Sequence, residues 1–235
     1  MTESQSAAPA RPRRSRYLID IVVLIAATLG LDVIAEAIYT PKSLEATFTF
    51  GLAIQMSQVA FAWLLIRKRR ETLADIGLKR PESWPRTIAI GILLAAIFFV
   101  AIYFSEQAGF HRDLSRFAAL KGNLNLTLFM VFYVLIGAGF YEEFMFRGFL
   151  MQGLAMCFGG SRGGWAIACA IQGILFGLAH AYQNPLGMLI AGTLGILLAI
   201  LVFVSGRNLW PAIIAHALFD ASRSVLIYFQ GPSGG

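Results

Sequence analysis

Residues 186–204 read LGMLIAGTLGILLAILVFV and contain no charged side chain. At about 1.5 Å per residue, a helix of this length crosses most of the ~30 Å hydrocarbon layer of a bilayer. Further apolar blocks lie at 21–31, 46–66, 87–104, 125–140, 164–182 and 209–229. Lipid offers the backbone no hydrogen-bond partners, so continuous apolar runs favour helices over barrel strands. The sequence therefore predicts an all-α, polytopic membrane helical bundle of seven to eight transmembrane helices.

The composition of the whole chain agrees with a membrane protein. Hydrophobic residues make up 57%, charged residues 14%, and the mean hydropathy is +0.68. Soluble domains carry about 25% charged residues. The apolar blocks leave no room for a separate soluble domain. We expect a disordered basic N-terminus at 1–16 and a single membrane-embedded domain at 17–235, with its functional core at about 125–229.

Lysine and arginine are concentrated in particular segments. Four arginines precede the first apolar block, and seven basic residues lie between 67 and 86. If the chain crosses the membrane seven times, the later connections that carry Arg162 and Arg207 lie on the same side of the membrane as these residues. Cytoplasmic connections are enriched in these residues, so the N-terminus is expected in the cytoplasm. The net charge of +6 and pI of 9.6 could suggest nucleic acid. Topology and anionic membrane lipid explain such short basic stretches better, so no nucleic-acid partner is expected.

Three acidic residues flank the first apolar block, 21–31. Its basic lead and the small residues Ala35 and Ala37 resemble a cleaved signal peptide. Asp20, Asp32 and Glu36 interrupt a segment that a signal peptide would keep apolar. We therefore expect a first membrane span whose acidic side chains face the other helices, because an unpaired carboxylate in lipid is costly.

Three groups of polar residues lie within apolar blocks of the second half. They are Glu142-Glu143-Phe-Met-Phe-Arg147, Phe176-Gly-Leu-Ala-His180 and His216-Ala-Leu-Phe-Asp220. Ionisable residues inside membrane spans are expensive to bury, so they are candidates for a functional site.

Helical spacing predicts which of these side chains meet. Residues four apart share a helix face, so Glu143 and Arg147 should form a structural ion pair. Glu142 is then left without a predicted ion-pair partner. His216 and Asp220 should likewise point into one space. Phe176 lies one turn before His180 and should pack beside its ring.

Counting from the connections predicts a common depth for the three groups. Glu142 and His180 each lie 19 residues from Ser161, and His216 lies eight residues after Asn208. Helical rise places His216 ~12 Å below the basic, cytoplasmic face, and Glu142 about 14 Å below it if roughly 10 Å of its long helix extends into the cytoplasm. The groups should converge into one site that opens to the cytoplasm.

A carboxylate and two imidazoles at one level can activate water. Glu142 would be the general base, and His180 would hold or polarise the water. His216 and Asp220 could orient the substrate carbonyl or stabilise its oxyanion, although an ionised Asp220 would repel an oxyanion. Asp220 would then be protonated, paired or bound to a cation.

Taken singly, each motif is also typical of a structural ion pair or of a packing histidine. In this order on successive segments, over roughly 125–225, they resemble the CPBP intramembrane protease family, which includes the CAAX prenyl endopeptidases and bacterial abortive-infection proteins. The resemblance implies a glutamate-dependent endopeptidase of the bacterial plasma membrane acting on a peptide or protein, lipidated or not. It implies that Glu142, His180, His216 and Asp220 are catalytic and that Glu143 and Arg147 are structural. Prenyl proteases of the family carry Asn at the position of Asp220.

Two questions stay open from the sequence. The resemblance implies no cofactor, yet Glu142, His180, His216 and Asp220 are also ligand types that Zn²⁺ accepts. A proton- or ion-coupled transporter also uses Glu and His within spans, but no inverted repeat is evident. A catalytically silent scaffold or immunity protein on the same fold is the other alternative, and it would not need the Glu and His residues.

Overall fold

The computed structural model describes residues 14–232 of the chain, apart from the side chain of Glu36. The helices are α1 (Arg14–Ile38), α2 (Leu44–Lys68), α3 (Trp84–Gln107), α4 (Leu124–Val134), η2 (Leu135–Met151), α5 (Gln152–Cys157), α6 (Arg162–Ala179), α7 (Asn184–Val204) and α8 (Trp210–Gln230), with short turns η1 (Ser115–Leu120) and η3 (Ala181–Gln183). The described residues form no strand. The predicted all-α fold is confirmed.

Within residues 14–232, seven helical segments are long and apolar enough to cross a membrane. One of them is the continuous run of α4, η2 and α5 over Leu124–Cys157, which has 34 residues. The predicted seven spans are therefore present. Residues 1–13 of the expected disordered N-terminus lie outside the described residues. The first helix begins at Arg14, so the last part of that segment, 14–16, is helical instead.

Several helices begin at a side chain that caps the free backbone N–H groups of the first turn. Ser43 accepts from the amide of Ala46, and Ser161 accepts from the amide of Gly164, each at 3.1 Å. Asn123 caps α4 in the same way through the amide of Leu126, also at 3.1 Å. These caps determine the residues at which helices α2, α4 and α6 begin.

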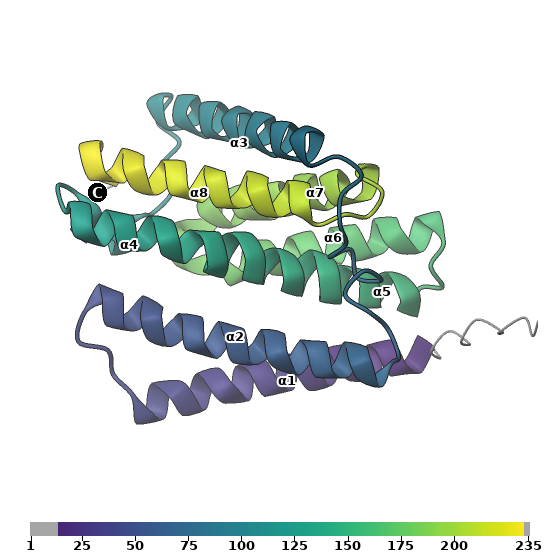
Figure 1. The fold of residues 1–235 in the computed structure, drawn as a ribbon. Coiled ribbons are helices and arrows are strands. Elements are labelled where there is room, and N and C mark those ends of the chain that lie inside the picture. The colour runs from purple at the N-terminus through teal and green to yellow at the C-terminus, as the bar shows by residue number, and fades with distance from the viewer. Residues whose placement is uncertain (1–13, 233–235) are drawn as a thin grey trace, which may run out of the picture.

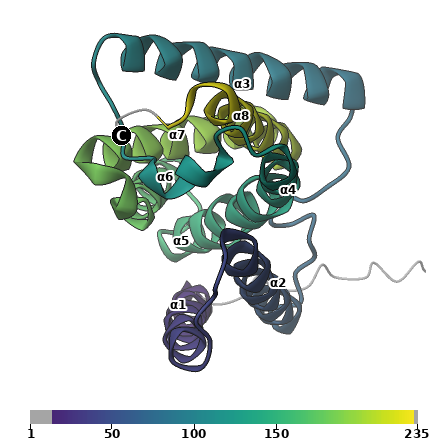
Figure 2. The ribbon, with the colours of Figure 1, turned by 90° about the vertical axis from the view of Figure 1, so that its left-hand side faces the viewer.

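The helices run roughly along one direction, apart from α3 (Figure 1). The hairpin of α1 and α2 lies on one side of the long α4–η2–α5 helix, and α6, α7 and α8 lie on the other (Figures 1 and 2). Helix α3 crosses the outer side of α8 at a large angle (Figure 2). A T-shaped contact between Phe98 of α3 and Phe219 of α8, with ring centroids 6.2 Å apart, lies in the core between them.

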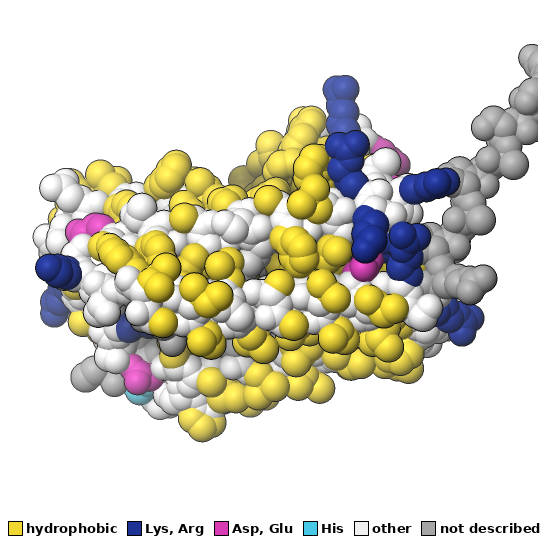
Figure 3. All heavy atoms as spheres, turned by 90° about the horizontal axis from the view of Figure 1, so that it is seen from below, with side chains coloured by type: hydrophobic (Ala, Val, Ile, Leu, Met, Phe, Trp, Pro, Cys, Tyr) yellow, Lys and Arg dark blue, Asp and Glu magenta, His cyan; other side chains and the backbone are white. Residues whose placement is uncertain are grey.

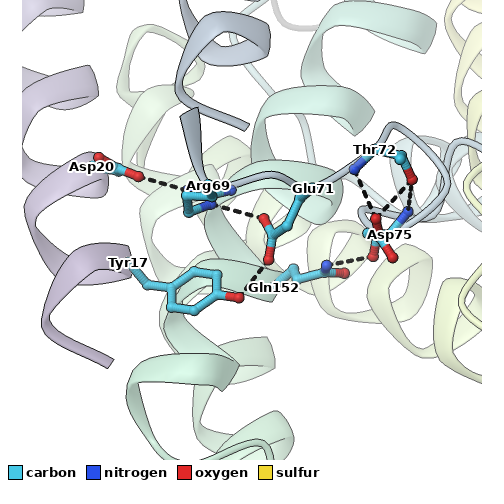
Figure 4. Close-up of polar contacts among 7 residues, drawn as sticks. All are labelled: Tyr17, Asp20, Arg69, Glu71, Thr72, Asp75 and Gln152. Carbon is cyan, nitrogen blue, oxygen red and sulfur yellow. Dashed lines mark hydrogen bonds and ion pairs between the residues drawn. The ribbon is translucent and has the colours of Figure 1, made fainter. Parts of the chain in front are cut away.

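A polar cluster attaches the α1–α2 hairpin to the rest of the molecule (Figure 4). Buried Arg69 pairs with Asp20 of α1 at 3.1 Å and with Glu71 at 2.8 Å. Tyr17 donates to Glu71, and Gln152 of α5 donates to the carbonyl of Asp75. Asp20 therefore faces the bundle as expected. Asp32 is exposed instead, at 3.5 Å from the amide of Gln58.

The surface has the charge distribution of a membrane-spanning protein. Hydrophobic side chains cover the middle of the face in Figure 3, and lysines and arginines gather at its ends, mostly at the end where the described chain begins. Contacts show that the connections predicted to be cytoplasmic share that end. Cys157 lies against the carbonyl of Arg14, and the ammonium of Lys79 donates to the carbonyl of Gly206. We call this the basic end.

Candidate active site

The three sequence groups lie on η2, α6 and α8, which meet in the middle of the molecule. A Cβ added at Gly139 would lie 2.6 Å from the Cβ of Ala217, so the backbones of η2 and α8 almost touch there. His216 directly precedes Ala217, and Glu142 and Glu143 follow Gly139 by about one turn. The absence of a side chain at Gly139 therefore lets the histidine and the two carboxylates approach each other.

The segment that carries the two glutamates is a π-helix, η2, which continues α4 without a break. The sequence predicted a plain helix from about 125 to 158. Most π-helical turns are single insertions within α-helices, and many are found at functional sites. Despite the wider winding, Glu143 and Arg147 still share a face, with Arg147 Nη1 2.8 Å from Glu143 Oε1. The predicted ion pair is confirmed.

Glu143 holds a second side chain that the sequence did not predict. Its Oε1 also lies 2.8 Å from His216 Nδ1. Both Glu143 and Arg147 are buried, at 0% and 1% exposure. A carboxylate paired with arginine only accepts hydrogen bonds, so Nδ1 of His216 is the donor. That tautomer directs Nε2 of His216 toward the remaining acidic residues.

Two more carboxylates surround Nε2 of His216. Asp220 Oδ2 lies 3.5 Å away, as the spacing on one helix predicted, and Glu142 Oε2 lies 3.8 Å away. This Glu142 oxygen is buried and has no hydrogen-bond partner among the described residues. Buried polar atoms without a partner are rare in native proteins and call for an explanation. A carboxylate oxygen in this state is placed to accept a proton from water.

His180 directly follows the last residue of α6. It adds a third element to the polar side chains that η2 and α8 contribute to the site. Its Nδ1 lies 2.8 Å from the carbonyl of Phe176, which can only accept, so Nδ1 donates. The ring centroids of Phe176 and His180 are 4.7 Å apart, as expected, and Phe176 also contacts His216 edge-on at 5.9 Å. The guanidinium of Arg147 lies 4.3 Å from the same phenyl ring. The ring of Phe176 thus contacts the guanidinium of Arg147 and the imidazoles of both histidines.

All four predicted catalytic residues line one cavity of about 290 Å³. Apolar residues form much of its wall. Among them are Phe98, Leu114, Leu120, Met130, Leu198 and Ile227.

The cavity extends from the catalytic group toward the end opposite the basic end. Its lining includes residues of the α3–α4 connection and of η3, but none of the described connections 69–83, 158–161 and 205–209 at the basic end. At the far end the α3–α4 connection is joined to η3, because the amide of Asp113 donates to the carbonyl of Gln183. The structure brings the four side chains together as predicted, and the cavity that they line extends away from the basic end, toward which the sequence analysis expected the site to open. Counting along single helices gave the depth of each residue but not which connections line the cavity.

Whether the site can hold a metal ion depends on the positions and the free donor atoms of its side chains. Among the described residues, no group of three or more His, Cys, Asp or Glu side chains is placed to hold a metal ion. His180 and His216 each use Nδ1 for a hydrogen bond, and each leaves Nε2 for the cavity. That the protein needs no cofactor stays a prediction, with zinc as its alternative.

Sequence reasoning missed two arginines that line the same cavity, Arg112 and Arg223. Arg223 lies seven residues after His216 and three after Asp220, so helical spacing could have placed it on the same face of α8. Arg112 comes from the α3–α4 connection, and no local pattern marks it. Two tyrosines also contact α2 beside the site, since Tyr141 donates to Gln58 and Tyr133 to Gln55.

Comparison with known proteins agrees with this part of the molecule. Residues 124–222 match the family model described as type II CAAX prenyl endopeptidase Rce1-like. The matched region contains all four predicted catalytic residues together with the Glu143–Arg147 pair. No curated protein and no solved structure matches the chain.

Proposed function

Because residues 124–222 match the family model of the type II CAAX prenyl endopeptidases, we propose that this chain is an intramembrane endopeptidase that uses a water activated by Glu142. The seven membrane-capable helices make it an integral membrane protein. The observation that carries the proposal is the buried, unpartnered Oε2 of Glu142 on the cavity wall, 3.8 Å from His216 Nε2.

In the proposed reaction, water binds between Glu142 and the free Nε2 of His180. Glu142 removes a proton as the water oxygen attacks the peptide carbonyl carbon. The carbonyl oxygen becomes an oxyanion, and His216 donates to it from Nε2 when that nitrogen carries a proton. Glu142 then passes the proton to the leaving amine, and the C–N bond breaks.

Glu143 and Arg147 support this chemistry without touching substrate. Glu143 fixes the ring of His216 through Nδ1, and Arg147 holds the Glu143 carboxylate in place through their ion pair. Asp220 lies beside Nε2 of His216 at 3.5 Å. In its protonated form Asp220 donates to the oxyanion together with His216.

The cavity favours an extended peptide with apolar side chains. Its walls are apolar between the catalytic group and the α3–α4 connection, and its volume of about 290 Å³ suits a few residues rather than a folded domain. A substrate peptide, lipidated or not, would enter from the end opposite the basic end. Peptides made with and without a prenyl group on one cysteine will decide whether the lipid is required.

The test is cleavage by the purified full chain in lipid nanodiscs. A pool of membrane-anchored peptides is incubated with wild type, Glu142→Gln and a control, Glu82→Gln, which removes an exposed carboxylate outside the cavity. Mass spectrometry identifies the products. We expect Glu142→Gln to lower the rate by ~10² to 10⁴, because the amide cannot accept the proton from water. Glu82→Gln should cleave at the wild-type rate.

The outcomes separate the proposed function from its rivals. Activity of Glu142→Gln within a factor of two of wild type would refute the assignment. A transporter would cleave none of the peptides but would show a proton flux that depends on Glu142. A silent scaffold would show neither activity.

A further inference from the structure

Gln183 lies on the wall of the catalytic cavity, three residues after His180. It is the last residue of η3, and it is 6% exposed. Its N–H donates to the carbonyl of His180 at 2.9 Å, and its carbonyl accepts from the amide of Asp113 at 3.1 Å. The backbone of Gln183 is therefore tied to that of a residue of the catalytic group.

One end of the Gln183 side chain is occupied and the other is not. Nε2 donates to the hydroxyl of Tyr182 at 2.9 Å. Oε1 is buried and has no hydrogen-bond partner within the described part of the chain. Among the described residues of the cavity wall, only Gln183 and Glu142 have a buried side-chain acceptor in this state. A buried acceptor without a partner is costly, so an occupant that donates to it would be stabilised.

A glycine in α7 makes room for this side chain. A Cβ at Gly187 would lie 2.3 Å from the Cβ of Gln183 and 3.3 Å from its Oε1, so the glutamine fills the space of the missing side chain. Ala191, Leu194 and Leu198 of the same helix line the cavity. Gly187 lies one turn before Ala191 on that face. The amide of Gln183 is therefore held on the side of α7 that faces the cavity.

A peptide in this cavity brings backbone N–H groups that need acceptors. Water satisfies these groups outside the cavity, but the apolar side chains of its wall cannot. The carboxylates of Glu142 and Asp220 act on the water and on the oxyanion in the proposed reaction. Of the two buried acceptors without a partner, Oε1 of Gln183 is thus the one left for the main chain of the substrate.

We propose that Gln183 accepts a hydrogen bond from a main-chain N–H of the substrate peptide, near the bond that is cleaved. This inference rests on the proposed function, because it takes the occupant of the cavity to be a peptide. A contact with the main chain does not depend on the side chains of the substrate, so Gln183 would position peptides of different sequence alike. Because Gln183 is bonded to the backbone of His180, the bound N–H and the water at His180 would keep a fixed separation.

Changes of single atoms in the peptide test this contact. The probe is the member of the membrane-anchored peptide pool that the full-chain Glu142→Gln protein binds most tightly in nanodiscs, where no turnover occurs. Each analogue replaces one N–H of this peptide by an ester oxygen, which cannot donate. We expect the ester at one position to bind about tenfold more weakly than the parent peptide, because one buried hydrogen bond is lost.

Variants of Gln183 in the Glu142→Gln protein show whether Gln183 is the acceptor. Gln183→Met and Gln183→Leu both lack the amide oxygen, so parent peptide and ester should bind within a factor of two of each other. Gln183→Glu keeps an acceptor oxygen and should restore most of the tenfold difference. The matched control is Gln172→Met, which removes a buried Oε1 that also lacks a described partner but lies outside the cavity wall. It should leave the difference unchanged.

Three results would overturn the contact. They are the failure of every pool peptide to bind, the absence of any ester that binds more than threefold more weakly than its parent, and a tenfold difference that persists in Gln183→Met or Gln183→Leu. Cleavage by wild type together with any of these results would leave the proposed function in place. If the ester effect depends on Gln183 but wild type cleaves no peptide, the proposed function fails and the contact stands.

Discussion

At the scale of single residues, the carboxylate of Glu143 contacts two side chains that have different roles. Arg147 neutralises its charge, and His216 uses it as the acceptor that fixes the imidazole, each at 2.8 Å. Glu142, the next residue, has no such partner on Oε2. Adjacent glutamates are thus divided between maintaining the core and facing the cavity.

Glu143→Gln should therefore destabilise the protein, whereas Glu142→Gln should not. Removing one partner of a buried ion pair costs about 3 kcal/mol or more, because the other charge stays buried without compensation. Thermal unfolding in detergent measures the difference between the two variants. An unfolding temperature for Glu143→Gln equal to that of wild type would contradict the structural role of the pair.

The sequence predicted the contacts within one helix and missed those between helices. The pairs Glu143–Arg147 and His216–Asp220 follow from a spacing of four, and the structure has both. The contact of His216 with Glu143 joins α8 to η2, and no spacing along the chain encodes it. Arg112 was missed for the same reason, since it reaches the cavity from a connection.

Asp220→Asn tests whether a metal takes part. Without metal, the amide of Asn can donate to the oxyanion, so activity should be preserved or raised. A zinc site that lost a carboxylate ligand would bind zinc less tightly and turn over more slowly. Cleavage rate and zinc content of the purified variant are measured together. Stoichiometric zinc in active wild type, with chelator inactivation reversed by zinc, would refute the metal-free mechanism.

At the scale of helices, the apolar blocks were enough to predict the spans. The block at 46–66 lies within α2, and the block at 209–229 coincides with α8 except for its first residue. The π-helical winding of η2 was not predictable, because its residues suit an α-helix equally well. Its position depends on tertiary contacts such as the approach of Gly139 to Ala217.

Gly139→Ala should separate η2 from α8 and disturb the site. The new Cβ would lie 2.6 Å from that of Ala217, which is closer than atoms can pack, so a helix must shift. We expect a loss of about 1 to 3 kcal/mol in stability and reduced cleavage. The matched control is Gly51→Ala on α2, where a Cβ meets nothing within 4 Å. Equal unfolding temperatures of the two variants would show that the close approach is unimportant.

At the scale of the whole molecule, the basic end and the part of the cavity lined by the α3–α4 connection lie at opposite ends of the bundle. By the positive-inside rule, we expect the basic end to lie in the cytoplasm. The α3–α4 connection, which lines the cavity at the other end, then faces away from the cytoplasm. This arrangement favours a substrate that reaches the enzyme from the non-cytoplasmic side, in contrast to the cytoplasm-facing peptide that the sequence suggested.

Labelling single cysteines with a membrane-impermeant maleimide tests this orientation. In a background without Cys157 and Cys169, Ser115→Cys of the α3–α4 connection and Glu82→Cys near the basic end place exposed thiols at opposite ends. On intact cells Ser115→Cys should be labelled and Glu82→Cys should react only after the membrane is opened. The reverse pattern would place the cavity entrance in the cytoplasm.

The different roles of Glu142 and Glu143 also affect which substitutions such a protein can accept during evolution. A descendant can lose hydrolysis by replacing Glu142 and still fold, because Glu142 Oε2 holds no other side chain. Replacing Glu143 removes the partner of both Arg147 and His216, so selection for a folded chain alone retains it. Related proteins that have lost proteolysis and gained another function are therefore expected to keep Glu143 and Arg147, whereas Glu142 is expected to vary.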